Sequence, residues 1–208
     1  MSQESNEIVG LLLAGGLARR MGGGDKALRQ LGGQSVLQRI INSISPQVST
    51  LLLNANGDPG RFAEYGLPVV PDVIDGFAGP LAGVLTGLEW VAANKPDCSW
   101  LATVPSDAPF MPTDLVSSLR DEMDRAGGEM ACAITNGRTH PVVGLWPVAL
   151  KDDLRKAMVD EDMRKIDLWT ARYKIVHVAF STDPVDPFFN ANRPEDFEKA
   201  EELLAKLP

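Results

Sequence analysis

The sequence predicts a single α/β domain with a mostly parallel β-sheet covered by helices on both faces. Strand-like apolar runs alternate along the chain with segments whose apolar residues recur at helical spacing. The 208 residues contain no internal repeat, low-complexity tract or linker, so residues 1–208 form one predicted domain that can bury a sizeable core. A composition of 44% hydrophobic and 23% charged residues is that of an ordinary globular protein.

The first half of the chain supplies three predicted strands and two predicted helices. The apolar runs 8–13, 48–53 and 67–70 predict strands, each followed by a turn or loop. Ser35 is the expected N-cap of a helix whose apolar residues run from Val36 to Ile44. The second helix begins near Gly79 and Pro80. Small residues at its start let a ligand or the backbone come close: Gly79, Ala82 and Gly83.

The second half departs from strict alternation. A buried strand is predicted at 99–104, followed by a helix at 113–125 with Thr113 as its cap. The runs 129–135 and 139–146 flank Asn136-Gly137 and predict a hairpin, which adds antiparallel strands at one edge of the sheet. Helices at 148–159 and 163–171, a strand at 174–180, a proline-rich loop at 183–192 and a helix opening at Pro194 complete the chain.

The most informative segment is the loop that follows the first strand. Residues 15–26 hold five glycines together with Arg19, Arg20 and Lys26. Successive glycine N–H groups can converge on one anion, and the three cations add charge beside them, so we interpret the loop as a phosphate cradle.

Two common nucleotide motifs do not fit this loop. A P-loop requires Gly-Lys-Ser/Thr, whereas Gly24 is followed by Asp25, Lys26 and Ala27. The G-x-G-x-x-A match at 22–27 begins eight residues past Ala14, too far from the strand for a dinucleotide-binding turn.

Polar residues also follow the other predicted strands. Asn54, Asp72 and Asp107 each come after a strand, where parallel sheets bind ligands. Asp107 lies between Pro105 and Pro109 in an apolar stretch, where a carboxylate needs a cation or hydrogen-bond donors. It is either a structural cap or, as we favour, a ligand of Mg²⁺ beside phosphates.

Residues on the acceptor side are less distinctive. Asn190 and Asn192 are either turn formers or further contacts of the site. His140 is a solvated turn residue or an acceptor contact, and the two histidines form no nucleophilic triad or zinc motif. If the attacking group is a phosphate, it is already ionised, and in-line positioning and charge neutralisation replace a general base.

Charge and cysteine usage limit the partners. A net charge of −8 argues against nucleic acid and anionic membrane, and the apolar runs are too short for a membrane span. The polar, acidic start of the chain resembles no secretory signal, so we expect a cytoplasmic protein. We also expect a monomer. Cys98 and Cys132 are expected to be free buried thiols, with a disulfide left open.

Five short motifs, taken together, resemble one family. They are Leu13-Ala14-Gly15-Gly16, Arg20-Met21-Gly22, Asp25-Lys26, Gly79-Pro80-Leu81-Ala82-Gly83 and Asp107-Ala108-Pro109. Over residues 8–197 the chain resembles the molybdenum cofactor guanylyltransferases. The resemblance implies a Rossmann-like three-layer sandwich and Mg²⁺-dependent transfer of GMP from GTP to the terminal phosphate of molybdopterin, with release of pyrophosphate. It also implies transient contacts with molybdenum cofactor biosynthesis proteins and apo-molybdoenzymes.

The resemblance implies a role for each matching residue. Lys26, Asp107 and Arg20 would be catalytic, and Asp107 would bind the metal as well as the nucleotide. The other residues implied to bind GTP or to close the site are Leu13, Ala14, Gly15, Gly16, Asn54, Asp72, Gly79, Asn190 and Asn192. Arg193 departs from the usual Asn-Thr-Pro-Glu-Asp ending, which leaves its role open.

Two other classes of function remain as alternatives. Cytidylyltransferases for the same cofactor tend to carry Leu-Ala-Ala-Gly in the first motif, whereas Gly16 and Asp25 here favour guanine. A related transferase with a sugar phosphate or phospholactate acceptor is the other enzymatic alternative. A nucleotide-binding regulatory module without turnover is disfavoured, because Lys26 and Asp107 are both present.

Overall fold

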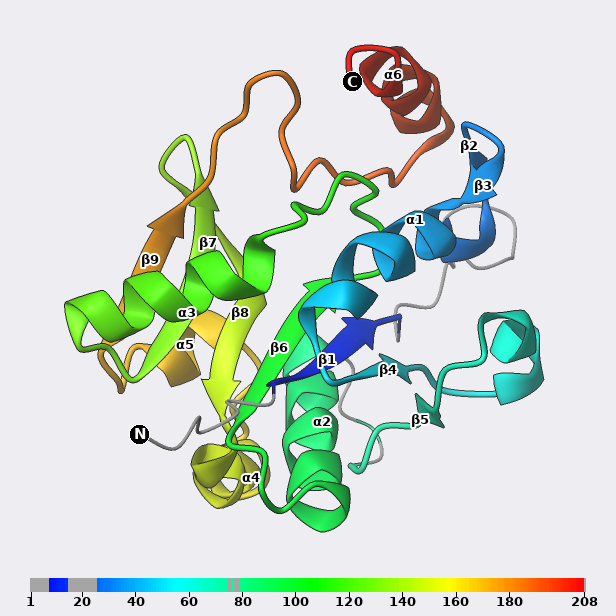
Figure 1. Ribbon diagram of the computed structural model, residues 1–208. Helices are drawn as coiled ribbons and strands as arrows, with labels where there is room; N and C mark the ends of the chain where they lie inside the picture. The colour runs from blue at the N-terminus through cyan, green and yellow to red at the C-terminus, as the bar shows by residue number, and fades with distance from the viewer. Residues whose placement is uncertain (1–7, 15–25, 75, 77–78, 208) are drawn as a thin grey trace.

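A computed structural model describes residues 8–14, 26–74, 76 and 79–207 of the chain. The described residues form a seven-stranded sheet of order β5-β4-β1-β6-β8-β7-β9 (Figure 1). The strands are β1 (Ile8–Leu13), β4 (Thr50–Asn54), β5 (Val69–Val70), β6 (Trp100–Pro105), β7 (Met130–Thr135), β8 (Arg138–Pro147) and β9 (Ile175–Ala179). The predicted α/β class is confirmed.

The sheet has a parallel part and an added part. β1 pairs in parallel with β4 on one side and with β6 on the other, and β4 pairs in parallel with β5. β8 pairs antiparallel with both β6 and β7. Asn136 and Gly137 form the turn from β7 to β8, with φ of 49° and 77°. The predicted hairpin therefore joins the sheet beside β6, and β9 pairs in parallel with β7 at the outer edge.

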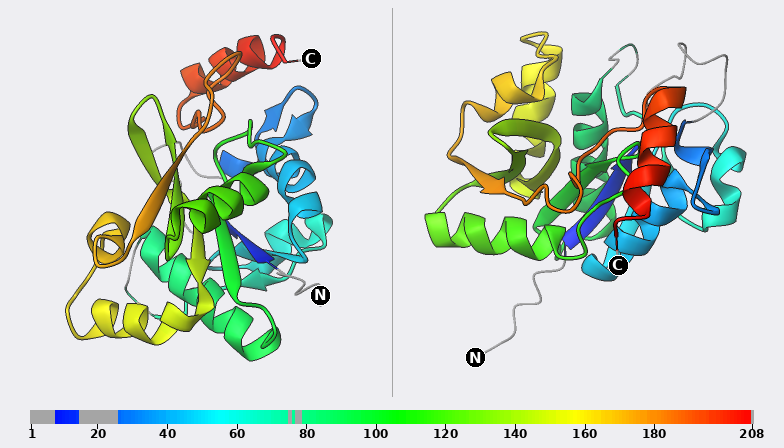
Figure 2. Two further views of the ribbon diagram at one scale, coloured as in Figure 1. Left: turned by 60° about the vertical axis from the view of Figure 1, so that its left-hand side comes forward. Right: turned by 90° about the horizontal axis from the view of Figure 1, so that it is seen from above.

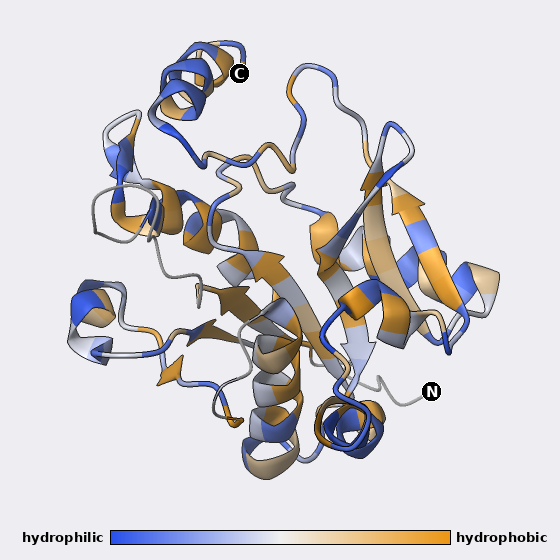
Figure 3. Cartoon of the chain, turned by 180° about the vertical axis from the view of Figure 1, so that it is seen from behind, coloured by the Kyte–Doolittle hydropathy of each residue, from blue (hydrophilic) through white to orange (hydrophobic). Residues whose placement is uncertain are grey.

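Helices cover both faces of the sheet, as expected (Figures 1 and 2). α1 (Val36–Ile44) and α3 (Leu115–Ala126) pack on one face, while α2 (Pro80–Asn94), α4 (Lys151–Val159) and α5 (Ile166–Thr170) pack on the other. Each face has its own hydrophobic core. Because side chains alternate along a strand, Leu12 points into the core beneath α1 and α3, and Leu11 points into the core beneath α2, α4 and α5. The central strands are largely hydrophobic (Figure 3), as burial on both faces requires.

The helix caps test two predictions. Ser35 caps α1 as expected, and its Oγ accepts a hydrogen bond from the Gln38 N–H at 3.1 Å. The predicted cap of α3 is wrong, because α3 begins at Leu115 and Asp114 occupies the N-cap position. The backbone carbonyl of Asp114, not that of Thr113, accepts the first bond of the helix, from Ser118 N–H at 2.9 Å. Two neighbouring residues that both favour caps do not fix the start of a helix to one position.

The sequence patterns did not predict several short elements. β2 (Gln30–Leu31) and β3 (Gln34–Ser35) form a small hairpin, which turns at Gly32 and Gly33 with φ of 57° and 78°. Three-residue or longer 3₁₀ turns, η1 (Lys26–Leu28), η2 (Ser45–Gln47), η3 (Pro59–Tyr65) and η4 (Val148–Leu150), join the larger elements.

The C-terminal helix α6 (Pro194–Leu204) lies next to the small β2–β3 hairpin in Figures 1 and 2. The Gly32 N–H donates to Glu201 Oε1 at 2.7 Å, and the Arg29 guanidinium lies 4.4 Å from the centre of the Phe197 ring. The end of the chain is thereby held against the segment that begins with Lys26.

Cys98 and Cys132 are buried thiols that are not joined in a disulfide, as expected. Within the part of the chain that the structure describes, no helix has the length and apolar character that crossing a bilayer requires.

Candidate active site at the carboxyl ends of the parallel strands

The parallel strands β4, β1 and β6 end side by side. Leu13 pairs with Asn54 on one side and with Pro105 on the other. Beyond the strands, the Ala14 N–H donates to the Asn54 carbonyl at 2.9 Å, and the Ser106 N–H donates to the Leu13 carbonyl at 3.2 Å. The loops that follow these strands therefore start from one edge of the sheet, where a parallel sheet binds its ligands.

Asn54 and Asp72 form the first polar group of the site. The Asn54 side chain is only 2% exposed, and its Nδ2 donates to Asp72 Oδ1 at 2.9 Å and to the Val70 carbonyl at 3.2 Å. Gly83 of α2 leaves the space that Asn54 needs, since a Cβ atom there would lie 2.5 Å from Asn54 Oδ1. Gly83 thus leaves room for the Asn54 side chain, rather than for the ligand or backbone that the sequence predicts.

Asp72 has a second amide partner, Asn56, in the segment that follows β4. Asn56 Nδ2 donates to Asp72 Oδ2 at 2.8 Å, and the Asp72 N–H donates to Asn56 Oδ1 at 2.9 Å. The signal available in the sequence was spacing, because residues two apart in an extended chain point to the same side, as Asn54 and Asn56 do.

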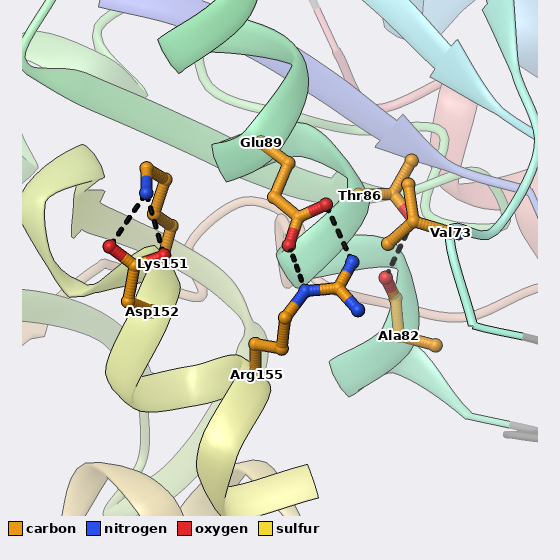
Figure 4. A network of polar contacts seen from close by, with 7 residues as sticks. All are labelled: Val73, Ala82, Thr86, Glu89, Lys151, Asp152 and Arg155. Atoms are coloured by element: carbon orange, nitrogen blue, oxygen red, sulfur yellow. Dashed lines mark hydrogen bonds and ion pairs between the residues drawn. The ribbon is translucent and has the colours of Figure 1, made fainter. Parts of the chain in front are cut away.

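A hydroxyl of α2 holds the chain directly after Asp72. The Val73 N–H donates to Thr86 Oγ1 at 3.0 Å, and this hydroxyl donates to the Ala82 carbonyl at 2.9 Å (Figure 4). In the same view, Glu89 of α2 forms a bidentate pair with Arg155 of α4, with Nε–Oε1 and Nη2–Oε2 distances of 2.5 and 2.8 Å. The chain next to Asp72 is therefore attached to α2, and the ion pair holds α2 to α4.

Lys26 and Asn192 form the second polar group. Lys26 Nζ donates to Asn192 Oδ1 at 2.8 Å. Asp196 of α6 fixes the backbone around Asn192, because its Oδ2 accepts from the N–H groups of Asn192 and Arg193 at 2.8 and 2.7 Å. Asn192 thus lies directly before the capped start of α6 and, through its side chain, contacts Lys26.

Asp107 belongs to this second group. Burial raises the pKa of its carboxyl above the ordinary 3.8, and the charge of Lys26 pulls that pKa in the opposite direction. The Ala191 N–H donates to the Asp107 carbonyl at 2.9 Å, which attaches the proline-rich loop to the loop after β6. The Asp107 carboxylate therefore lies within electrostatic range of the Lys26 ammonium group, which is itself hydrogen-bonded to the Asn192 amide.

The donors around Asp107 limit the metal that the site can hold. Among the described residues, no group of three or more His, Cys, Asp or Glu side chains is placed to bind an ion. A zinc-type site is not formed by those residues, whereas a hard cation that takes most of its ligands from water and phosphate needs only one or two carboxylates. Asp107 fits the second case.

The remaining predicted residues differ in what the structure says of them. Gly79 is the exposed N-cap of α2, with a φ of 150° that favours glycine. Asn190 is exposed on the chain next to Ala191. Gly15, Gly16 and Arg20 lie outside the described residues.

His140 is not a solvated turn residue. Its Nε2 lies 2.7 Å from Thr135 Oγ1, and its ring packs 4.6 Å from the ring of Phe188, in the loop that leads to Asn190. Burial lowers the pKa of the imidazole, which is opposed by the Asp186 carboxylate and assisted by Arg138. His140 therefore supports the proline-rich loop as a packed side chain.

The family model and the proteins that match this chain by sequence agree with one another. Residues 10–173 match the family model of the MobA-like NTP transferase domain. A molybdenum cofactor guanylyltransferase of Rhodopseudomonas palustris (strain BisB5) is 53% identical over 196 residues, which cover 94% of this chain and 93% of the relative. A protein with the same name from Bradyrhizobium sp. (strain ORS 278) is 53% identical over 204 residues, covering 98% and 96% of the two chains.

A solved structure supports the fold. The molybdopterin-guanine dinucleotide biosynthesis protein A of Archaeoglobus fulgidus superposes with a TM-score of 0.76 at 21% identity, covering 96% of this chain and 100% of that one. The Rossmann-like nucleotidyltransferase architecture is therefore shared although four residues in five differ.

Proposed function

Because this chain belongs to the molybdenum cofactor guanylyltransferases, within the MobA-like NTP transferases, we propose that it transfers GMP from GTP to the terminal phosphate of molybdopterin. The observation that carries the proposal is the cluster of Lys26, Asp107 and Asn192 at the carboxyl end of β6. Such a cluster offers positive charge and a metal-binding carboxylate to phosphates, which are the groups that direct transfer from one phosphate to another requires. The alternative acceptors and CTP are not favoured by the relatives' names.

The chemistry follows from these groups. The terminal phosphate of molybdopterin attacks the α-phosphorus of GTP, the bond from that phosphorus to the bridging oxygen breaks, and pyrophosphate leaves with the electron pair. The attacking oxygen is already ionised at neutral pH, so no protein base has to remove a proton. Lys26 neutralises charge that develops on the phosphate oxygens, and Arg20 is proposed to do the same from the glycine loop.

Asp107 is proposed to hold Mg²⁺. This ion would supply a Lewis acid for the phosphate oxygens when bound. The half-buried position of Asp107 strengthens its interaction with a cation, since screening by water is reduced.

The nucleoside side of the site is proposed to consist of the strand ends and the start of α2. Leu13, Ala14, Gly15 and Gly16 would contact GTP through backbone groups, and Asn54, Asp72 and Gly79 would contact the nucleoside. What supports this part is that Leu13, Ala14, Asn54 and Asp72 lie along one sheet edge. Asn190 and Asn192 are proposed to close the site toward molybdopterin.

We further propose a monomeric, cytoplasmic enzyme that contacts molybdenum cofactor biosynthesis proteins and apo-molybdoenzymes transiently. Two buried cysteines that are not joined in a disulfide are consistent with a reducing compartment. Gel filtration of the purified protein tests the monomer directly.

The experiment that tests the reaction is nucleotide selectivity. Purified protein is incubated with Mg²⁺, molybdopterin and each nucleoside triphosphate in turn, and pyrophosphate and the dinucleotide product are measured. We expect product with GTP, a preference over CTP of roughly 10⁴-fold as is typical of sites that hydrogen-bond a base, and no product after chelation of the metal. Equal or faster reaction with CTP, or no reaction with GTP, would contradict the proposal.

A further inference from the structure

Asn56 lies outside the residues that the family motifs contain, yet it makes two contacts with a residue of the proposed nucleoside site. It follows β4 in an exposed position, and its amide both donates to Asp72 Oδ2 and accepts from the Asp72 N–H. Its backbone is held as well, since Arg61 Nη2 donates to the Asn56 carbonyl at 2.8 Å. Three hydrogen bonds therefore hold this exposed asparagine.

The side-chain amides of Asn54 and Asn56 donate to different oxygens of the Asp72 carboxylate. Asn54 donates to Oδ1 at 2.9 Å and Asn56 donates to Oδ2 at 2.8 Å. A carboxylate oxygen can accept more than one hydrogen bond, so each oxygen keeps capacity for a further donor. Both torsions of the Asp72 side chain are thereby fixed while its accepting capacity remains.

We propose that Asn56 is a positioning residue that fixes the Asp72 carboxylate to accept two adjacent donors of the bound nucleoside. This inference rests on the proposed function, in which Asp72 contacts GTP. Two parts of GTP present such a pair of donors: the N1–H and N2–H groups of guanine, and the 2′- and 3′-hydroxyls of the ribose. A fixed carboxylate meets either pair without losing torsional freedom on binding, which is the advantage of preorganisation.

The contact is separate from the reacting phosphorus in the proposed site. Loss of Asn56 therefore removes binding that substrate and transition state share, which raises KM and leaves kcat unchanged. A purely structural role would instead lower the amount of folded enzyme and leave KM unaffected.

The first test compares Asn56→Ala and Asn56→Asp with a matched control. We expect Asn56→Ala to raise KM for GTP about tenfold, with kcat within about twofold of wild type, since one charged hydrogen-bond contact is worth roughly that factor. Asn56→Asp keeps the shape and the acceptor for the Asp72 N–H but places a carboxylate oxygen against Asp72 Oδ2, so its KM rises further. The control is Asn94→Asp, at the far end of α2, where an exposed asparagine donates only to the Trp90 carbonyl.

The second test is a double-mutant cycle. If Asn56 acts through Asp72, then Asn56→Ala causes no further loss of GTP affinity in the Asp72→Ala background. Titration calorimetry with GTP and Mg²⁺, without acceptor, supplies this readout even if the proposed transfer to molybdopterin fails, so the two failures can be told apart. Unchanged GTP affinity in both Asn56 variants, or full additivity with Asp72→Ala, would overturn the inference.

Two GTP analogues identify the donor pair. Inosine triphosphate lacks the guanine 2-amino group, and 2′,3′-dideoxy-GTP lacks both ribose hydroxyls. The analogue that has lost the Asp72 contact binds wild type more weakly than GTP and is insensitive to Asn56→Ala. If Asn56→Ala lowered the affinity for GTP and for both analogues by the same factor, Asp72 would accept from neither pair of donors. The inference would then be wrong.

Discussion

Lys26 Nζ donates a 2.8 Å hydrogen bond to Asn192 Oδ1 across 166 positions of sequence. The contact joins the segment directly after the glycine-rich loop to the loop before α6, and both ends lie beside Asp107. The position of the ammonium group therefore depends on two segments that are far apart in the sequence.

The first prediction concerns the charge of Lys26. Lys26→Met should lower kcat roughly 10²- to 10³-fold, because a fixed cation near developing phosphate charge is lost. Since the charge of Lys26 lowers the pKa of Asp107, its removal lets burial raise that pKa further. A plot of kcat/KM against pH should then show the acid limb displaced to higher pH.

Lys206→Met is the control for that experiment, because Lys206 is exposed near the end of the chain. Its pH profile should match wild type. An acid limb that stays in place in Lys26→Met would mean that another group than Asp107 governs the acid side.

The second prediction separates activity from stability at Asp107. Asp107→Asn should lower metal-dependent turnover by roughly 10³-fold, because the neutral amide is a poor ligand for a hard cation. The folded protein should not be destabilised at pH 7. Burial raises the pKa of Asp107 in the folded state, so the carboxylate opposes folding once the pH exceeds that pKa.

Urea unfolding at two pH values checks the sign. In a chelator, Asp107→Asn should be at least as stable as wild type at pH 7, and the difference should shrink as the pH falls toward the ordinary value of 3.8. Loss of stability at pH 7 would show instead that the carboxylate is an essential structural cap.

Local patterns predicted much of this fold because the forces behind them are local. The Ser35 cap, the apolar face of α1 and the turn at Asn136-Gly137 each depend on residues a few positions apart. The positions of Asn54, Asp72 and Asp107 at the sheet edge were predicted in the same way, from polar residues that follow apolar strands.

Features that depend on distant pairing could not be read from the chain. The place of β9 beyond β7 and the bond between Lys26 and Asn192 bring together segments far apart in sequence. Asn56 shows a different limit, because an asparagine before a glycine is typical of a turn whether or not it also orients a carboxylate.

The third prediction uses two glycines of α2. Gly83→Ala places a Cβ 2.5 Å from both Asn54 Oδ1 and Leu13 Cδ2, so Asn54 must move from Asp72. We expect KM for GTP to rise about tenfold, the equivalent of one lost polar contact. Gly87→Ala is the matched control, because it has the same helix propensity gain and crowds the apolar side chains of Leu101 and Leu11.

Steady-state kinetics on both variants distinguish packing from binding. Gly87→Ala should alter the melting temperature and leave KM unchanged. Equal KM changes in the two variants would imply that crowding anywhere on α2 disturbs the site.

The fourth prediction concerns β6, the strand that precedes Asp107. Thr103 of β6 is buried, and its hydroxyl accepts from Trp146 Nε1 at 2.8 Å and donates to the Val142 carbonyl at 2.9 Å, across the pairing of β6 with β8. Thr103→Val keeps the shape but leaves the buried Trp146 Nε1–H and the partly buried Val142 carbonyl without this partner, at about 1–3 kcal/mol for the buried group and less for the other. The free energy of unfolding should fall by roughly 2–4 kcal/mol, which lowers the melting temperature by several degrees.

Thr103→Ser is the comparison, since it retains the hydroxyl and removes one methyl group, with a loss of about 1 kcal/mol. Thermal and urea unfolding of the three proteins should therefore rank wild type above Thr103→Ser and Thr103→Ser above Thr103→Val. If the valine variant were the more stable of the two, apolar packing between β6 and β8 would outweigh the hydroxyl bonds, and the position of Asp107 would depend on shape alone.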